Sequence, residues 1–144
     1  MAFVISNPPE FTLDVEQWNR TTRADGERMS EVIGKLLNND VHAKHTNERQ
    51  DSTVLVTLEA AGWTGTEAPY IQEVAVAGAS GDLAGVLLVS ALEDGASLET
   101  QKAYTKVFGI VSSGTAILGD GVAVFKVYKR PETDITVGLR GVMP

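Results

Sequence analysis

The chain has 144 residues, of which 43% are apolar and 22% are charged, so it has room for one globular domain and an extension. Its net charge is −7 and it has no cluster of Lys and Arg, which argues against binding to nucleic acid or to an anionic membrane surface. The absence of cysteine excludes a disulfide framework and a thiolate site.

The first 20 residues predict an extended attachment segment. Pro8 and Pro9 exclude a helix here, and apolar residues are too frequent for a free tail. The segment also lacks the long apolar region of a signal peptide, so we expect synthesis in the cytoplasm. Residues 1–18 should be mobile in the isolated protein and protected in an assembly. The residues expected to make the attachment are Phe3, Ile5, Phe11, Leu13 and Trp18.

A helix is predicted at about residues 22–38. Thr22 and Asp25 have the spacing of a capping box, and Asn38 and Asn39 are expected to end the helix. Apolar residues recur with helical spacing and form one stripe. A helix of this length is not stable alone, so the stripe needs a partner, either the rest of the chain or copies of itself. The residues expected to mediate oligomerisation are Met29, Val32, Ile33, Leu36 and Leu37.

The segment from residue 38 to residue 52 is almost wholly polar, and it is either a linker or a solvated continuation of the helix. We therefore predict an N-terminal region at residues 1–52 and a β head at residues 53–144. His42 and His45 lie three residues apart in the polar segment. Two imidazoles are too few for a zinc site in one chain, although a three-fold axis would multiply them. The preferred interpretation is a pair of solvated histidines.

From Thr53 onward the apolar pattern changes to a period of two, which is typical of β-strands. Short strands at this spacing predict a mainly β fold, with a small antiparallel β-sandwich or barrel of five to seven strands. The longest apolar run, at residues 83–92, is too short to span a bilayer, so no membrane insertion is expected. The expected elements are strands at about residues 54–58, 71–76, 107–111, 122–128 and 135–139, a central strand covered on both faces at residues 85–92, and a helix at residues 97–106.

Two local signals within the β head are specific. Ser97 is the expected N-cap of the short helix, whose Leu98, Ala103 and Tyr104 should face inward. The sequence Gly119-Asp-Gly121 predicts the turn of a β-hairpin.

The sequence contains no motif for catalysis, for a cofactor or for a metal ion. The serines next to glycine do not form a nucleophile elbow, and the glycine-rich segment lacks the residues of a phosphate loop. Carboxylates are abundant, but nothing separates a catalytic pair from ordinary turn residues. Core packing is the more frequent role of aromatic residues in a β module, and the alternative is that Trp63 and Tyr70 form a platform on which a sugar ring stacks. Trp63 is the better candidate for an exposed ring because glycines surround it in a predicted loop.

Two blocks of sequence resemble a module of phages and prophages of Gram-positive bacteria. The first is Gly62-Trp63, Ala68-Pro69-Tyr70 and Val74-Ala75-Val76, and the second runs from Lys129 through Arg130-Pro131 and Asp134-Ile135 to Leu139. The resemblance is to proteins of the tail and baseplate region and covers about residues 53–142. It implies a homotrimeric virion appendage, a fibre-type protein of the tail, baseplate or head, without catalytic residues. Residues 1–20 would then contact other virion proteins, and the head could meet a glycan of the host surface.

Three hypotheses therefore compete. The first is the virion structural protein, with an anchor, an oligomerising helix and a β head that takes part in host attachment. The second is a monomeric carbohydrate-binding β-sandwich module that uses Trp63 and Tyr70. The third is a small hydrolase, which the lack of His and Cys chemistry would limit to carboxylates.

Overall fold

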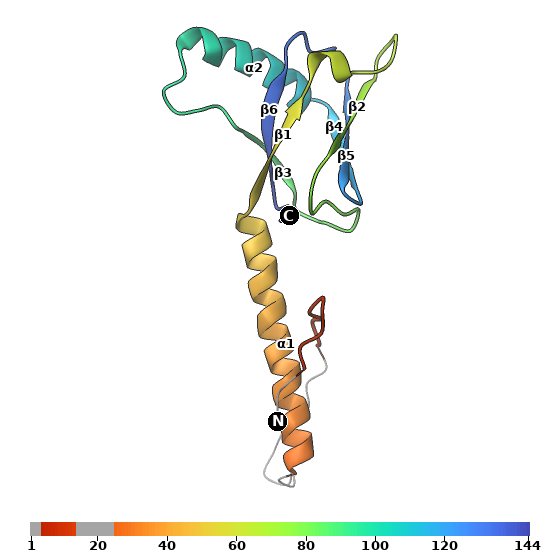
Figure 1. Cartoon of the computed structure of the whole chain (residues 1–144), viewed down its shortest axis with the longest axis vertical. Coiled ribbons are helices and arrows are strands. Elements are labelled where there is room, and N and C mark those ends of the chain that lie inside the picture. Colours follow the sequence, from red (N-terminus) through yellow and green to blue (C-terminus); the bar gives the residue numbers. More distant parts are fainter. Residues whose placement is uncertain (1–3, 14–24) are drawn as a thin grey trace. The chain divides into compact units, whose positions relative to one another are not determined.

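The computed structural model describes residues 4–13 and 25–144 (Figure 1). The chain divides into two compact units, Met1–Glu48 and Arg49–Pro144, and each is described here by itself. Of the described residues, about 34% are helical and about 26% are in strands. The expected mainly β class is therefore correct only in part, since one helix-rich segment accompanies two small antiparallel sheets.

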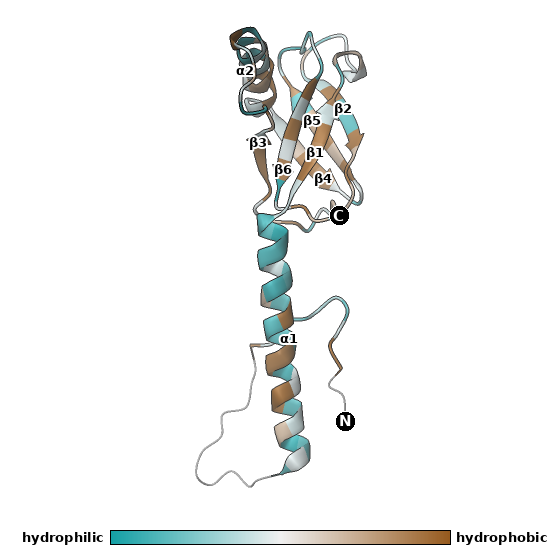
Figure 2. Cartoon of the chain, turned by 60° about the vertical axis from the view of Figure 1, so that its left-hand side comes forward, coloured by the Kyte–Doolittle hydropathy of each residue, from teal (hydrophilic) through white to brown (hydrophobic). Residues whose placement is uncertain are grey.

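The long helix α1, Gly26–Asp51, begins four residues later than predicted and continues well beyond the expected stop. Asp25 is its N-cap, since its Oδ1 accepts a hydrogen bond from the Glu27 amide at 2.9 Å and its carbonyl accepts one from the Met29 amide at 2.9 Å. The polar segment after residue 38 is thus a solvated helix continuation. Figure 2 shows the apolar residues of α1 in its N-terminal half and hydrophilic residues toward its C-terminal end.

Two antiparallel sheets form the second unit. Strands β1 (Thr53–Leu58), β6 (Ile135–Arg140) and β3 (Leu87–Ser90) pair in the order β1-β6-β3. Strands β2 (Tyr70–Ala75), β5 (Val122–Val127) and β4 (Thr115–Gly119) pair in the order β2-β5-β4. A short 3₁₀ helix, η1 (Ala60–Gly62), follows β1. The predicted hairpin is confirmed, since β4 and β5 are joined at Gly121, which has a φ of 72°.

The prediction of a central strand at residues 85–92 is wrong. Strand β3 is short, lies at the edge of its sheet and leaves Leu87 exposed, while β6 occupies the centre. A continuous apolar run is typical of a strand with both faces covered, but no residue of β3 is fully buried. Here β3 pairs with β6 alone.

The second helix, α2 (Leu98–Ser112), starts where predicted but replaces the strand expected at residues 107–111. Ser97 caps it by accepting a hydrogen bond from the Thr100 amide at 3.1 Å. Val107 and Val111, one helical turn apart, are its buried residues, so burial outweighs the strand preference of valine. Of the three residues expected to face inward, Leu98 and Ala103 are exposed and Tyr104 is half-buried.

Among the residues that the structure describes, the core lies wholly in the second unit. Both sheets and α2 contribute to it, and strand alternation puts Val56, Leu58, Phe125 and Val137 inside. Tyr104 ties α2 to the sheet β1-β6-β3, since its hydroxyl donates to the Thr136 carbonyl and accepts from the Ala91 amide, both at 2.8 Å. The buried apolar residues are Val56, Leu58, Trp63, Val76, Ala79, Val107, Val111, Ala123, Phe125, Val127, Ile135, Val137, Leu139 and Val142.

Candidate functional site

The residues predicted to mediate oligomerisation lie together on α1 and stay accessible within the first unit. No residue of α1 is buried. Val32 is half-buried, and the other four are exposed. We call this set, Met29, Val32, Ile33, Leu36 and Leu37, the apolar stripe of α1. A stripe of this kind normally packs against another element, because an amphipathic helix gains most of its stability from burying that face.

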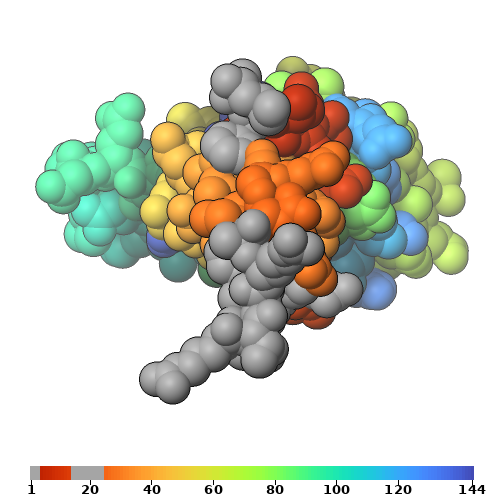
Figure 3. Space-filling view, turned by 90° about the horizontal axis from the view of Figure 1, so that it is seen from below, coloured from red at the N-terminus to blue at the C-terminus, as the bar shows by residue number. Residues whose placement is uncertain are grey.

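Residues 4–13 are held against α1 by two asparagines (Figures 1 and 3). Asn38 Oδ1 accepts from the Ser6 amide at 3.0 Å and from the Ser6 hydroxyl at 3.2 Å, and Asn38 Nδ2 donates to the Val4 carbonyl at 3.5 Å. Asn39 makes both of its hydrogen bonds with Thr12. Its Oδ1 accepts from the Thr12 amide at 2.8 Å, and its Nδ2 donates to the Thr12 carbonyl at 2.9 Å. The two side chains thus act as hydrogen-bond partners of an extended backbone and not as a helix stop.

This arrangement differs from the expectation of a mobile tail, at least for residues 4–13. The backbone is anchored, yet the apolar side chains point outward, with Val4 86% and Leu13 90% exposed. Ile5 and Phe11 are exposed to a smaller degree, and Phe11 packs on His42 with their ring centroids 5.7 Å apart. Phe3 and Trp18, the other two predicted attachment residues, lie outside the described residues.

The histidines of α1 do not come together with other potential ligands. His42 is half-buried beneath Phe11, and His45 is exposed. Across residues 4–13 and 25–144, no group of three or more His, Cys, Asp or Glu side chains is placed to hold a metal ion. Within the same ranges, no helix is long and apolar enough to cross a membrane.

The prediction of an exposed Trp63 is wrong, since its side chain is only 3% exposed. A backbone bridge between Thr64 and Ile71 places Trp63 opposite Gln72 at the start of β2, where both side chains enter the core. Tyr70 is half-buried on β2. The predicted sugar-stacking platform therefore loses its main ring, because the loop around Trp63 folds against β2 instead of standing in solvent.

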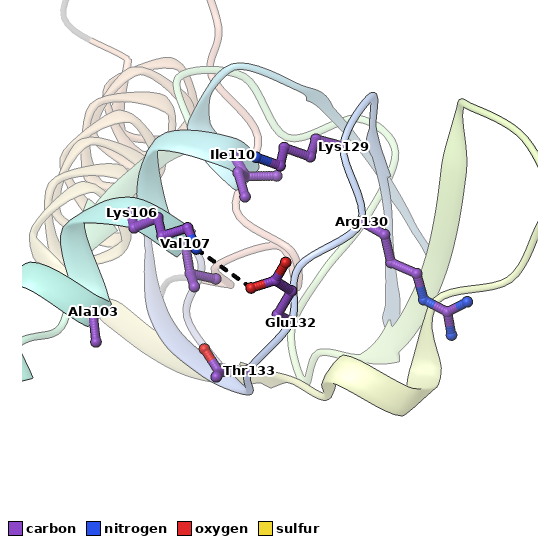
Figure 4. Close-up of a pocket in the computed structure, with 8 residues that line it drawn as sticks. All are labelled: Ala103, Lys106, Val107, Ile110, Lys129, Arg130, Glu132 and Thr133. Carbon is purple, nitrogen blue, oxygen red and sulfur yellow. Dashed lines mark hydrogen bonds and ion pairs between the residues drawn. The ribbon is translucent and has the colours of Figure 1, made fainter.

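One groove runs between α2 and the connection from β5 to β6. It has a volume of about 120 Å³ and is drawn in Figure 4, where Arg130 points away from it. The Lys106 ammonium lies 3.3 Å from the Glu132 carboxylate across this groove. Ala103, Val107 and Ile110 contribute apolar side chains, and the charged residues of the lining come from both walls. Its lining residues are Ala103, Lys106, Val107, Ile110, Lys129, Arg130, Glu132 and Thr133.

A second concavity, about 450 Å³ in volume, lies between β1 and β2, and we call it the β1–β2 crevice. Its walls are the edge strands of two different sheets. The sequence did not predict this crevice, because the alternation of apolar and polar residues within a strand does not indicate which strands are neighbours. Its lining residues are Leu55, Val56, Thr57, Glu59, Gly62, Gln72, Glu73, Val74 and Ala75.

Two buried side-chain atoms have no hydrogen-bond partner among the described residues, and the first of them belongs to a residue that lines this crevice. They are Gln72 Oε1 and the indole nitrogen of Trp63. The Gln72 amide packs directly over Gly62, in the space that a Cβ atom would need. Gln72 is only 6% exposed, so its unpaired oxygen stands out in a core that is otherwise apolar.

Comparison with known proteins found no matching family model, no matching curated protein and no matching solved structure.

Proposed function

We propose that the chain is a non-enzymatic structural protein of a phage virion, a homotrimeric appendage of the tail, baseplate or head. Its N-terminal region would attach to other virion proteins, and the unit Arg49–Pro144 would form the head. The virion assignment rests on the resemblance of the Gly62–Val76 and Lys129–Leu139 blocks. Self-association has independent physical support in the first unit.

The observation that carries the proposal is the apolar stripe of α1. Met29, Ile33, Leu36 and Leu37 remain exposed on a helix that buries none of its residues. Burial of apolar surface contributes about 25 cal/mol per Å², so packing these side chains against copies of themselves would stabilise the helix substantially. The stripe occupies the N-terminal half of α1, while the polar C-terminal half needs no partner. Association through the first unit therefore fits the pattern best.

The anchored segment supports attachment through the same unit. Val4, Ile5, Phe11 and Leu13 present apolar side chains outward from a backbone that Asn38 and Asn39 already hold in place. A pre-ordered strip of this kind loses less conformational entropy on binding than a free tail would. It is suited to contact with another virion protein.

Light scattering coupled to size-exclusion chromatography tests self-association. We expect a mass three times that of the 15.4 kDa chain at micromolar concentration. A mass of one chain under these conditions would contradict the proposal.

Mass spectrometry of purified phage particles from the source strain tests the virion assignment. Peptides of this chain should be enriched in the particles relative to the cleared lysate. Their presence in the lysate alone would contradict the virion role and leave self-association to be judged by the mass measurement.

A further inference from the structure

The free edge of β1 presents unpaired backbone groups at alternate residues. The Gly141 amide donates to the Ser52 carbonyl at 2.9 Å, which fixes the hydrogen-bonding phase of the ladder between β1 and β6. In an antiparallel pair, alternate residues direct both backbone groups toward the partner strand. Val56 therefore faces β6 with its N–H and C=O, whereas Leu55 and Thr57 direct theirs away from it.

The same reasoning applies to β2. The Val76 amide donates to the Gly121 carbonyl at 2.8 Å, so Val74 and Gln72 are the residues whose backbone groups face β5. Glu73 and Ala75 direct their N–H and C=O groups away from β5. Since β1 and β2 belong to different sheets, neither strand supplies the other with partners.

These two free edges line the β1–β2 crevice. Leu55, Thr57, Glu73 and Ala75 all contribute to its walls. Gln72 lines it as well, and its Oε1 is a buried acceptor without a partner. Exposed strand edges attract additional strands, and natural proteins usually cover or charge them. The crevice therefore brings two such edges together.

We propose that the β1–β2 crevice binds an extended polypeptide segment of a partner protein, which adds as a strand to the free edge of β2. The backbone of the segment would pair with Glu73 and Ala75 on the free edge of β2, which is the general mode of β-strand addition, and its other side would face β1. The charges of the crevice specify the segment further. Glu59 and Glu73 line the crevice, and no Lys or Arg does, so the segment carries Lys or Arg at its ends.

The first test is NMR spectroscopy of the full-length protein with a synthetic probe. The probe is the acetylated and amidated heptapeptide Lys-Thr-Val-Thr-Val-Thr-Lys, and the same peptide with Glu at both ends is its charge control. A third peptide, with N-methyl groups along one edge, cannot pair with a strand. We expect the Lys peptide to shift the amide signals of Leu55, Thr57, Glu73 and Ala75 and to slow the hydrogen exchange of Glu73 and Ala75. Equal binding of either control, or shifts elsewhere, would overturn the proposal, as would no binding at millimolar peptide.

Proline at a free edge provides the second test, since an outward N–H can be removed without breaking the ladder. Ala75→Pro should weaken peptide binding at least tenfold. Ala116→Pro is the matched control, because Ala116 lies on the free edge of β4 by the same alternation and away from the crevice. Unchanged affinity of Ala75→Pro would overturn the proposal.

Glu73→Lys keeps the proposal falsifiable if Ala75→Pro does not fold, because Glu73 is exposed. This variant should bind the Lys peptide more weakly and the Glu peptide more tightly. If it still prefers the Lys peptide, the proposed positive charge of the segment is wrong.

A second copy of this chain is the alternative occupant. If the amides of Glu73 and Ala75 are protected without peptide, and deletion of residues 1–13 removes that protection, the crevice belongs to the N-terminal segment of a neighbouring copy and the proposal fails.

Discussion

The two units of the chain place their apolar side chains in opposite ways. In Arg49–Pro144, strand alternation and the helix α2 direct them into one core. Among the described residues before Arg49, none of the large apolar side chains is buried, and those classed as exposed are Val4, Ile5, Phe11, Leu13, Met29, Ile33, Leu36 and Leu37. The second unit can therefore account for its own stability, whereas the described part of the first unit leaves its large apolar side chains accessible, as the proposed self-association requires.

The largest expected effect is a loss of stability in the second unit. Phe125 is completely buried on β5, so Phe125→Ala should remove about 3–5 kcal/mol from its free energy of unfolding. Ile117→Ala on the neighbouring strand β4 is the control, because Ile117 is exposed and should cost less than about 1 kcal/mol. Urea unfolding followed by circular dichroism measures both values. Equal losses would show that the assigned core is wrong.

The next effect concerns the first unit. Replacing both Ile33 and Leu36 with Asp would put charges at the proposed subunit contact and cost assembly several kcal/mol. The mass in solution should fall to that of one chain, while the β-type circular dichroism of the second unit persists. Lys44→Asp and Asn47→Asp on the polar half of the same helix should leave the mass unchanged. An unchanged mass in the Ile33/Leu36 variant would place self-association elsewhere.

A smaller effect locates the start of the second unit. Arg49 donates from Nη1 to the Gly141 carbonyl at 2.7 Å, and the Arg140 guanidinium donates to the Gln50 carbonyl at 3.1 Å. A fragment of residues 49–144 should therefore fold alone. A fragment of residues 53–144 should lose about 1–2 kcal/mol, seen as a melting temperature lower by several degrees. Identical melting temperatures would show that these contacts contribute nothing.

The smallest expected effect concerns the hydrogen bonds that hold residues 4–13 on α1. Asn38→Ala combined with Asn39→Ala removes the partners of Ser6 and Thr12, at a net cost of about 1 kcal/mol for each hydrogen bond. Residues 4–13 should then be cleaved faster in limited proteolysis, with no change in the unfolding of the second unit. Asn47→Ala, an exposed asparagine later on α1, is the control. Unaltered cleavage would show that other contacts hold the segment.

Local chemistry in the sequence was sufficient for part of this architecture. Ser97 marked the start of α2, Gly121 the hairpin between β4 and β5, and the alternation of Val54, Val56 and Leu58 the strand β1. Each of these signals acts within a few residues, through a cap, a positive φ or a two-residue period, so it can be read without knowing the fold. The stripe of α1 was readable for the same reason, and its exposure is what supports the proposed self-association.

Only the tertiary structure decided the remaining features. Val107 and Val111 became helical because one helical turn puts both into the core, and the Trp63 ring was buried because its loop pairs with β2. Asn38 and Asn39 bind the backbone of residues 4–13 instead of ending α1, since partners distant in the sequence were within reach. The β1–β2 crevice arises from strand order, which depends on pairings between residues far apart in the chain. The sequence determines local preferences, and long-range burial and hydrogen bonding select among them.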